Sequence, residues 1–431
     1  MPVAIVGGGA SGTILAAQLA RRGIKSMLID GSGRMGRGVA YSTTEAAHLL
    51  NVRAEGMSAW AGQPDHFAKR FKREGGEARG FAQRRLFGRY LGEILDEAVA
   101  SGHVEVRHET AVAARRSGDG WAIQLDGGSS VDAEALVLAV GNQEPEALRA
   151  FAGAGSHFIR NPWGDESRAA VAELAAAGGS PLLVGTGLTM VDLVLSLDAA
   201  GFEGKIVALS RRGLIPRAHA DFSPAPVDGA LPDGLRGMFR WLRRRGAQIG
   251  WRAAVDSLRP HTFALWQALT HDEQRRFLRH ARPWWDVHRH RIAPEVARTV
   301  ARLVGDGRLE IVAGRIVDAK ATGSGLQVIY RRRGTMVDQS ATFDYAFNCT
   351  GPLHSIERTK DSLLRSLLDA GSVRPDRLGI GLEVSGTARA GEHLWAMGPL
   401  TKGRFWEIIA VPDIREQAAI VAGDIERELR A

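Results

Sequence analysis

Cysteine is almost absent from this sequence of 431 residues, since Cys349 is the only one. A single cysteine excludes an intramolecular disulfide, a C-x-x-C redox pair and any metal site built from several cysteines. Lysine is also scarce, so the net charge of +8 comes almost entirely from arginine. The arginines are scattered in short runs such as 331–333, and no nucleic-acid-binding module accompanies them. We therefore expect no nucleic-acid partner.

Long hydrophobic runs are missing as well. No apolar stretch reaches the roughly 18 to 20 residues that a membrane span needs, and the sequence starts directly on a strand pattern, which leaves no room for a signal peptide. We expect a cytoplasmic protein without a membrane partner. Apolar residues make up 45% and charged residues 24%, as in globular proteins, and the length predicts two domains.

A glycine-rich turn follows the first apolar run, residues 2–6. Gly7, Gly9 and Gly12 complete the pattern G-x-G-x-x-G, and helical spacing follows them. This order is typical of a dinucleotide site in which Gly7 reverses the chain, Gly9 leaves room for a pyrophosphate and Gly12 lets the helix approach the strand. The next predicted strand ends in Asp30, where a carboxylate can bind the adenosine ribose.

A second unit of the same kind lies in the middle of the sequence. Gly185 and Gly187 occupy the first two glycine positions. Leu188 and Thr189 belong to the same predicted turn and to the predicted NADPH site, and a helix is predicted over residues 191–198. Met190 replaces the third glycine, which predicts a slightly wider spacing between helix and strand. Both glycines that let a phosphate approach are kept, so this unit also predicts a dinucleotide site.

The strand after the second unit, residues 205–209, is followed by Ser210, Arg211 and Arg212 rather than by an acid. A carboxylate would repel the 2′-phosphate of NADPH, whereas arginine pairs with it. We therefore predict FAD at the first unit and NADPH at the second. A solvated surface pair is the alternative interpretation of the two arginines.

A fully apolar strand, residues 135–140, ends at Gly141, as strands of a parallel sheet covered on both faces do. Residues 345–350 repeat this ending at Gly351. A third short strand runs into Gly398 and Pro399. Backbone without side chains at Gly141 and Gly398 would let a cofactor approach closely. The N-terminus of a helix near Ile409, predicted within residues 406–426, would stabilise negative charge on a reduced flavin.

The predicted fold class is α/β with two Rossmann-like dinucleotide-binding domains. The FAD domain, of glutathione-reductase type, would comprise residues 1–160 and 335–431. The NADPH domain would be inserted between them as residues 161–334, with a helical insertion at about 232–305 that is rich in arginine, histidine and tryptophan.

Five further segments occur in the same order as in a known group of proteins, namely residues 36–42, 48–52, 209–213, 282–291 and 406–415. Through them the sequence resembles the two-dinucleotide-domain flavoproteins, and more closely the bacterial FAD/NAD(P)-binding protein family. The resemblance covers nearly the full length but implies no particular substrate. It implies additional FAD contacts at Ser11, Gly38, Tyr41, Asn51 and Val112.

A second resemblance concerns the chemistry. Class B flavoprotein monooxygenases carry F-x-G-x-x-x-H-x-x-x-W between the first strand that ends in glycine and the second nucleotide unit. Phe151, Gly153 and His157 fill this pattern, whereas Trp163 comes two residues late. The resemblance implies a catalytic role for His157, and a linker histidine on an interdomain surface is the alternative.

The expected reaction is hydride transfer from NADPH to FAD, followed by O₂ activation and oxygenation of a small substrate. The alternatives are an NADPH-dependent flavin reductase or dehydrogenase that passes electrons to a quinone or another acceptor, and a flavin-binding sensor. Without a dithiol, disulfide reductase chemistry is excluded. The oligomeric state is left open.

Three residues join His157 as catalytic candidates: Asn51, Trp284 and His288. The last two lie in the helical insertion, where packing of the helices is the alternative. His288 and His290 lie two residues apart without further ligands, so we expect no metal site.

Overall fold

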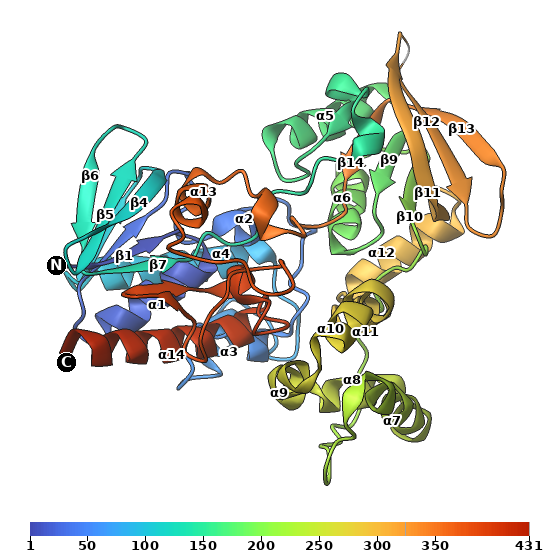
Figure 1. The fold of residues 1–431 in the computed structure, drawn as a ribbon. Coiled ribbons are helices and arrows are strands. Elements are labelled where there is room, and N and C mark those ends of the chain that lie inside the picture. The colour runs from blue at the N-terminus through green and yellow to red at the C-terminus, as the bar shows by residue number, and fades with distance from the viewer. Residues whose placement is uncertain (324, 431) are drawn as a thin grey trace.

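The computed structural model describes residues 1–323 and 325–430, and its two larger sheets form separate halves of the molecule (Figure 1). The first sheet has the order β15-β16-β7-β1-β2-β3, in which all neighbours are parallel except β15 and β16. Its strands are β1 (Val3–Val6), β2 (Ser26–Ile29), β3 (Val104–Arg107), β7 (Ala135–Leu138), β15 (Arg389–Gly391) and β16 (Leu394–Ala396).

Each face of the first sheet is covered by its own layer. One face packs against the helices α1 (Ala10–Ala20), α4 (Arg84–Ala100) and α14 (Val411–Arg430), whose apolar residues form one core with the sheet. The other face packs against α13 (Ser362–Asp369) and a small antiparallel sheet of β4 (Ala111–Ser117), β5 (Gly120–Leu125) and β6 (Ser130–Ala133). Two short helices, α2 (Gly38–Tyr41) and α3 (His66–Arg73), complete this half.

The second sheet has the order β13-β12-β11-β10-β9-β14-β8. The neighbours from β8 to β11 are parallel, and β11, β12 and β13 form an antiparallel meander. Its strands are β8 (Phe158–Ile159), β9 (Pro181–Val184), β10 (Ile206–Ser210), β11 (Leu309–Thr322), β12 (Gly325–Arg332), β13 (Asp338–Phe343) and β14 (Tyr345–Asn348). The helices α5 (Asp165–Ala177), α6 (Leu188–Ala199) and α12 (Pro294–Gly305) share a core with this sheet.

Between β10 and α12 the chain forms a helical module, which lies below the second sheet in Figure 1. It contains α7 (Gly234–Ile249), α8 (Trp251–Ser257), α9 (Thr262–Ala268), α10 (His271–Arg276) and α11 (Arg282–Arg289), with a π-helical turn at Phe277–Ala281. The helical insertion was predicted at about 232–305, a range that contains these helices and also α12, which packs on the sheet. Trp406 from the other half of the molecule completes the core of the module.

The sheet topology corrects both predicted domain boundaries. Residues 158–159 were expected in the first FAD segment, 1–160, but β8 belongs to the second sheet. Residues 335–348 were expected in the second FAD segment, but β13 and β14 belong to the second sheet, where β14 lies between β9 and β8. A short, mostly buried strand such as β14 fits either sheet equally well, so only its pairing with β9 decides its place. Helix α14 begins at Val411 rather than Trp406, because Glu407 adopts a left-handed φ of 76° that no α-helix contains.

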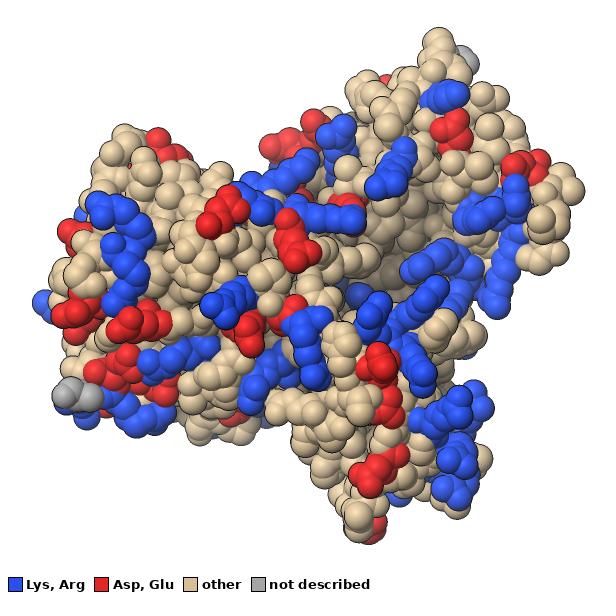
Figure 2. Space-filling model, viewed as in Figure 1, with Lys and Arg blue, Asp and Glu red and all other residues tan. Residues whose placement is uncertain are grey.

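Charged side chains of both signs are mixed over most of the face in Figure 2, and Lys and Arg side chains gather over α7 at the lower right. None of the described helices is long and apolar enough to span a membrane.

Candidate active site

The first glycine turn joins β1 to α1 by two close approaches of the backbone. Gly7 has a φ of 107°, and a side chain there would collide with the carbonyl group of Ala139. A side chain at Gly12 would collide with the carbonyl oxygen of Gly7, so this glycine does let the helix lie close to its strand. Glycine is required at both positions by the fold itself.

Gly9 differs from Gly7 and Gly12 because nothing in the protein requires glycine there. Its φ of −74° and ψ of −169° suit any residue, and an added Cβ would meet only Gly38, with the Cα at 3.5 Å. Helix α1, which follows Gly9, has no side-chain cap and no acid in its first turn. Open space beside uncapped N–H groups fits the pyrophosphate of a dinucleotide. Gly38, a predicted FAD contact, is thus brought directly to this position.

Asp30 lies at the end of β2, as predicted, and its carboxylate organises the turn. One oxygen accepts a hydrogen bond from the N–H of Gly8 at 2.6 Å, and the other accepts one from Ser32 at 2.7 Å. Each carboxylate oxygen keeps a further lone pair, so the group can still accept a ribose hydroxyl.

Several other predicted FAD residues gather at the end of the first sheet. The buried Ser11 lies beneath Gly398, where an added Cβ would come within 2.9 Å of its hydroxyl oxygen. Gly141 and Pro399 line one small cavity with Lys402, whose Nζ donates to Oδ1 of Asn142 at 3.2 Å. Burial, assisted by the charge of the nearby Arg282, lowers the pKa of Lys402 to about 8.

The remaining predicted FAD residues are spread around this end of the molecule. Tyr41 packs against Phe87 with ring centroids 4.7 Å apart, and burial raises its pKa to about 12. Val112 is a half-buried residue at a bulge in β4. Ile409 is exposed and precedes the first turn of α14.

Asn51 lies at a contact between the two halves. Its carbonyl oxygen accepts a hydrogen bond from Nε2 of His219 at 3.0 Å. Burial lowers the pKa of His219 to about 4, so the ring is neutral at pH 7 and donates this bond from Nε2.

The second glycine turn repeats the geometry of the first. Gly185 has a φ of 119°, and a side chain there would collide with the carbonyl group of Cys349, which follows β14 as Ala139 follows β7. An added Cβ at Gly187 would have no neighbour within 4 Å. Helix α6 begins at Leu188 without a side-chain cap or an acid in its first turn, to which Thr189 also belongs. This position therefore also has room for a pyrophosphate.

The residues after β10 fall into two kinds. The hydroxyl of Ser210 bonds to Oγ1 of Thr186 at 2.8 Å and accepts from the N–H of Gly213 at 3.0 Å, so it shapes the turn. Arg211 is exposed and Arg212 half-buried, and neither has an ion-pair partner in the described part of the chain. Both guanidinium groups remain available for an anion.

His157 lies at the amino ends of the parallel strands, directly before β8, whereas Gly185 lies at their carboxyl ends, directly after β9. Its Nδ1 donates to the carbonyl oxygen of Asp344 at 2.8 Å, and Asp344 bonds to Ser180 at the beginning of β9. Dinucleotides bind beyond the other ends of such strands, their carboxyl ends. This position agrees with the alternative of a linker histidine rather than with a cofactor contact.

Trp284 and His288 lie on α11 in the helical module. Trp284 is 46% exposed, and its carbonyl oxygen accepts a hydrogen bond from Nδ1 of His288 at 2.7 Å. The imidazole packs edge-on against Trp251, with ring centroids 4.9 Å apart. Both side chains border a groove of the module, and neither approaches the two glycine turns through any contact described above.

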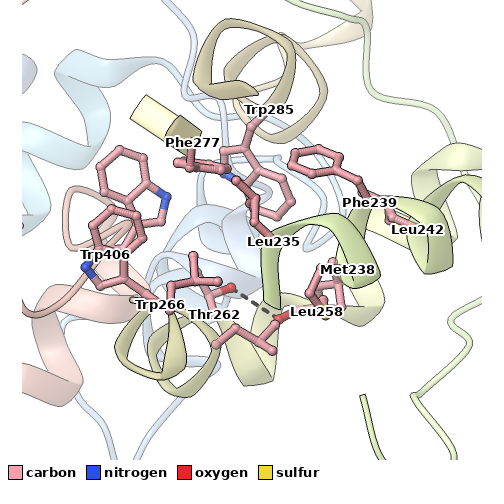
Figure 3. A pocket seen from close by; sticks show the side chains of 12 residues that line it. Leu235, Met238, Phe239, Leu242, Leu258, Thr262, Trp266, Phe277, Trp285 and Trp406 are labelled. Atoms are coloured by element: carbon pink, nitrogen blue, oxygen red, sulfur yellow. Dashed lines mark hydrogen bonds between the residues drawn. The ribbon is translucent and has the colours of Figure 1, made fainter. Parts of the chain in front are cut away.

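The segment from Gly398 to Ala410 connects the end of the first sheet to the helical module. The indole of Trp266 donates to the carbonyl oxygen of Gly403 at 2.9 Å and stacks on Trp406, with ring centroids 4.7 Å apart. This aromatic contact is central to the apolar core of the module (Figure 3).

Glu407, a residue that the sequence analysis missed, anchors this segment to α11. Its buried carboxylate accepts from Nε1 of Trp285 at 2.7 Å and pairs with His290 at 3.1 Å and Arg289 at 3.2 Å. Burial alone would raise the pKa of Glu407, but His290, Arg289 and the bond from Trp285 hold it lowered to about 2. Its only sequence signal is an acid within an otherwise apolar run, residues 406–411.

The segment at residues 48–52, which carries part of the resemblance, lies against α6 of the other half. Nε2 of His48 lies 3.1 Å from both the carbonyl oxygen of Asp192 and Oγ of Ser196. Beside it, Arg84 binds the carboxylate of Asp192 through two nitrogens at 2.8 and 3.0 Å. The two halves are therefore joined by a mostly buried ion pair.

Among residues 1–323 and 325–430, no group of three or more His, Cys, Asp or Glu side chains is arranged to hold a metal ion. Cys349 is buried against the second glycine turn, and burial raises the pKa of its thiol.

Residues 4–143 match a family model described as FAD-NAD(P)-binding, which confirms the predicted resemblance over this part of the chain. No curated protein matches the sequence. The chain is similar in structure to L-lysine 6-monooxygenase from Pseudomonas syringae, with a TM-score of 0.70 and 15% identity over 99% of each chain. The reduced form of ornithine hydroxylase from Pseudomonas aeruginosa gives a TM-score of 0.69 at 15% identity, also over 99% of each chain.

Thioredoxin reductase from Lactococcus lactis is similar as well, with a TM-score of 0.57 and 14% identity over 99% of each chain. At such identities the likeness establishes the fold, and the predicted fold class of two dinucleotide-binding domains is confirmed. Together with the family match, these folds support an FAD- and NAD(P)H-dependent oxidoreductase.

Proposed function

We propose that this protein is an NADPH-dependent FAD enzyme of the monooxygenase type that acts on a small substrate. The observation that supports it most is the pair of open glycine positions, Gly9 and Gly187. Each lies between a buried parallel strand and an uncapped helix, and at each the protein itself leaves the space of a side chain unfilled. Two such positions suit two dinucleotides.

When bound, NADPH supplies a hydride to FAD, and the reduced flavin reacts with O₂. The residues of this chain hold the two groups. Gly9 and α1 accommodate the FAD pyrophosphate, and Asp30 accepts a ribose hydroxyl. Gly187 and α6 do the same for NADPH, whose 2′-phosphate pairs with Arg211 and Arg212.

Lys402 acts at the flavin end of the first site. It shares a cavity with Gly141 and Pro399, and burial lowers its pKa to about 8. Its Nζ therefore holds a proton at pH 7 close to where negative charge develops on reduction.

Two features favour oxygen over a thiol or disulfide as the electron acceptor. The only cysteine, Cys349, is buried, and its raised pKa keeps it protonated. The segment after Gly398 carries Trp406 into an apolar core and Glu407 into a buried ion-pair network. A site bordered by such groups excludes bulk water. An oxygenating flavin requires this exclusion.

The decisive experiment is an absorption spectrum of the purified protein, followed by anaerobic titration with NADPH and NADH in parallel. We expect bound flavin that NADPH bleaches preferentially. A colourless protein that FAD does not reconstitute would refute the proposal. Oxygen uptake and peroxide release then distinguish a monooxygenase from a reductase. With a monooxygenase, a substrate should lower the amount of peroxide formed per NADPH oxidised. Rapid reduction of quinones with negligible oxygen uptake would instead indicate the reductase.

A narrower test concerns the choice of nicotinamide cofactor. Arg211→Glu places a carboxylate beside the proposed 2′-phosphate site, so it should weaken reduction by NADPH at least tenfold and leave reduction by NADH within about twofold. Anaerobic stopped-flow measurement of flavin bleaching gives both values. Equal losses with the two nucleotides would remove Arg211 from this role.

A further inference from the structure

Helix α7 of the helical module has an apolar face that the protein covers only in part. Leu235, Met238, Phe239 and Leu242 recur at helical spacing, yet no residue of this 16-residue helix is buried. These four side chains line a cavity of 80 Å³, opposite Trp406 (Figure 3). A cavity of this size has room for several groups the size of a water molecule, and its lining is almost wholly apolar.

One flank of the same helix is basic. Arg236, Arg240 and Arg243 follow one another at spacings of four and three residues, so they lie along one side of α7. All three are exposed, and no described carboxylate forms an ion pair with any of them. Figure 2 shows that Lys and Arg side chains gather over α7.

This basic flank borders a larger groove of 1300 Å³ between α7 and α11. Arg276, His280 and Trp284 form the opposite wall. Arginines outnumber acids four to two around the groove, and one of the acids, Glu273, is already engaged. Its carboxylate accepts from the N–H of Leu235 at 2.9 Å and from the N–H of Thr270 at 3.1 Å. The groove thus carries unbalanced positive charge beside aromatic rings.

The groove and the apolar cavity adjoin each other and share part of their lining. Leu235, Phe239, Leu242 and Trp285 line both of them. Trp285 also donates to Glu407, and Trp406 closes the far wall of the cavity. These shared residues and contacts link the exposed arginines of α7 to the segment that follows Gly398 at the end of the first sheet.

We propose that this groove binds an amphiphilic organic anion, with a carboxylate or phosphate at Arg240 and Arg243 and an apolar body against Phe239 and Trp285. This assignment names the substrate class for the proposed function and rests on that function. A small molecule fits better than a polyanion, because the three arginines span only about 10 Å of helix and adjoin an apolar cavity of 80 Å³. Trp284 and His288 then line the same substrate groove.

The test measures binding rather than turnover. Decanoate is titrated into the full-length protein with its bound cofactor and without NADPH, and affinity is followed by calorimetry and tryptophan fluorescence. We expect decanoate to bind at least tenfold more tightly than decylammonium, which has the same chain and the opposite charge. Affinity should also rise severalfold from hexanoate to decanoate, because each added methylene is buried.

The variant Arg240→Gln/Arg243→Gln should weaken decanoate binding at least tenfold. The matched control Arg275→Gln/Arg279→Gln removes two exposed arginines of the same module that do not border the groove, and it should bind within twofold of the wild type. Equal losses in both variants, equal binding of decylammonium, or no dependence on chain length would overturn the proposal. So would arginine-dependent binding of phosphatidylglycerol vesicles without binding of monomeric decanoate.

Reduction of the flavin by NADPH, measured on the same preparations, separates this proposal from the one on which it rests. Decanoate binding in a protein that NADPH does not reduce would refute the proposed reaction and keep the groove as an anion site. Normal flavin reduction without decanoate binding would refute the groove alone.

Discussion

At the scale of single residues, the glycines of the two turns divide into two kinds with different consequences. Gly7, Gly12 and Gly185 are required by the backbone, because any side chain there would meet a carbonyl group. Gly9 and Gly187 are required by nothing within the protein. If the proposed dinucleotides occupy this space, substitution at Gly9 or Gly187 should separate binding from folding.

Gly187→Ala tests this distinction at the second site. The added methyl group has no protein neighbour within 4 Å and the backbone angles suit alanine, so stability should fall by less than about 1 kcal/mol. NADPH binding should weaken at least tenfold, because the methyl group lies in the path of the pyrophosphate. Denaturant unfolding and nucleotide titration give the two values. Gly305→Ala, which adds a methyl group in open space at the end of α12, should change neither.

Lys402 gives a prediction that depends on pH. Its lowered pKa of about 8 means that the ammonium is present at pH 7 and lost as the pH rises through that value. Lys402→Met should therefore lower the midpoint potential of the bound flavin at pH 7, and the difference from wild type should vanish above about pH 9. Spectroelectrochemical titration at several pH values measures this. A difference in midpoint potential that stays constant across pH would assign Lys402 a packing role. Lys360→Met, at an exposed lysine, serves as the control.

At the scale of elements, the segment between β16 and α14 joins the first sheet to the helical module. It contains a left-handed residue, Glu407, whose φ of 76° costs of the order of 1 kcal/mol for a residue with a side chain. Its carboxylate, bound by Trp285, His290 and Arg289, offsets that cost. The helical module is thus fixed to the first half of the molecule by one buried acid and the stacked Trp266 and Trp406.

Glu407→Gln should destabilise the protein by about 3 kcal/mol at pH 7, since the pKa of the carboxyl is about 2 when folded and near its usual value when unfolded. This contribution is complete above the unfolded pKa and is lost as the pH falls through the folded one. The difference between variant and wild type should therefore narrow only below about pH 4.5. Denaturant unfolding at pH 7, 4 and 3 follows it, with the exposed Glu416→Gln as control. A pH-independent difference would contradict the electrostatic explanation.

At the scale of the whole molecule, the two halves must hold their sites in a fixed relation if hydride is to pass between two dinucleotides. The contact that serves this purpose is the ion pair of Arg84 and Asp192, supported by His48. Asp192 is almost completely buried, so losing its partner would leave an uncompensated charge at the interface.

Arg84→Met should therefore loosen the interface, at a cost of about 3 to 5 kcal/mol. We expect a larger radius of gyration by small-angle X-ray scattering and slower flavin reduction, with NADPH affinity changed less than threefold. Adding Asp192→Leu should restore the compact state, because both charges are then absent. If Arg85→Met, which alters an exposed neighbour, has the same effect, the ion pair is not responsible.

The sequence by itself determined both glycine turns, the acid at the end of β2, the arginines after β10 and the helical nature of residues 232–305. These features depend on short spacings within one strand, turn and helix, so neighbouring residues suffice to specify them. The same local patterns did not fix where helices begin: α6 begins at Leu188 rather than at the predicted residue 191, and α14 begins at Val411 rather than near residue 406.

Only the tertiary structure decided which sheet receives β14, where His157 lies and what Glu407 and Lys402 contact. An apolar strand pairs equally well with either sheet. The residues around a histidine in a linker do not determine at which end of the sheet its side chain will lie. Glu407 and His290 are more than one hundred residues apart in sequence, and their charges matter only once folding removes both from water. The lowered pKa of Glu407 and its ion pairs therefore depend on burial, which cannot be predicted from the local sequence.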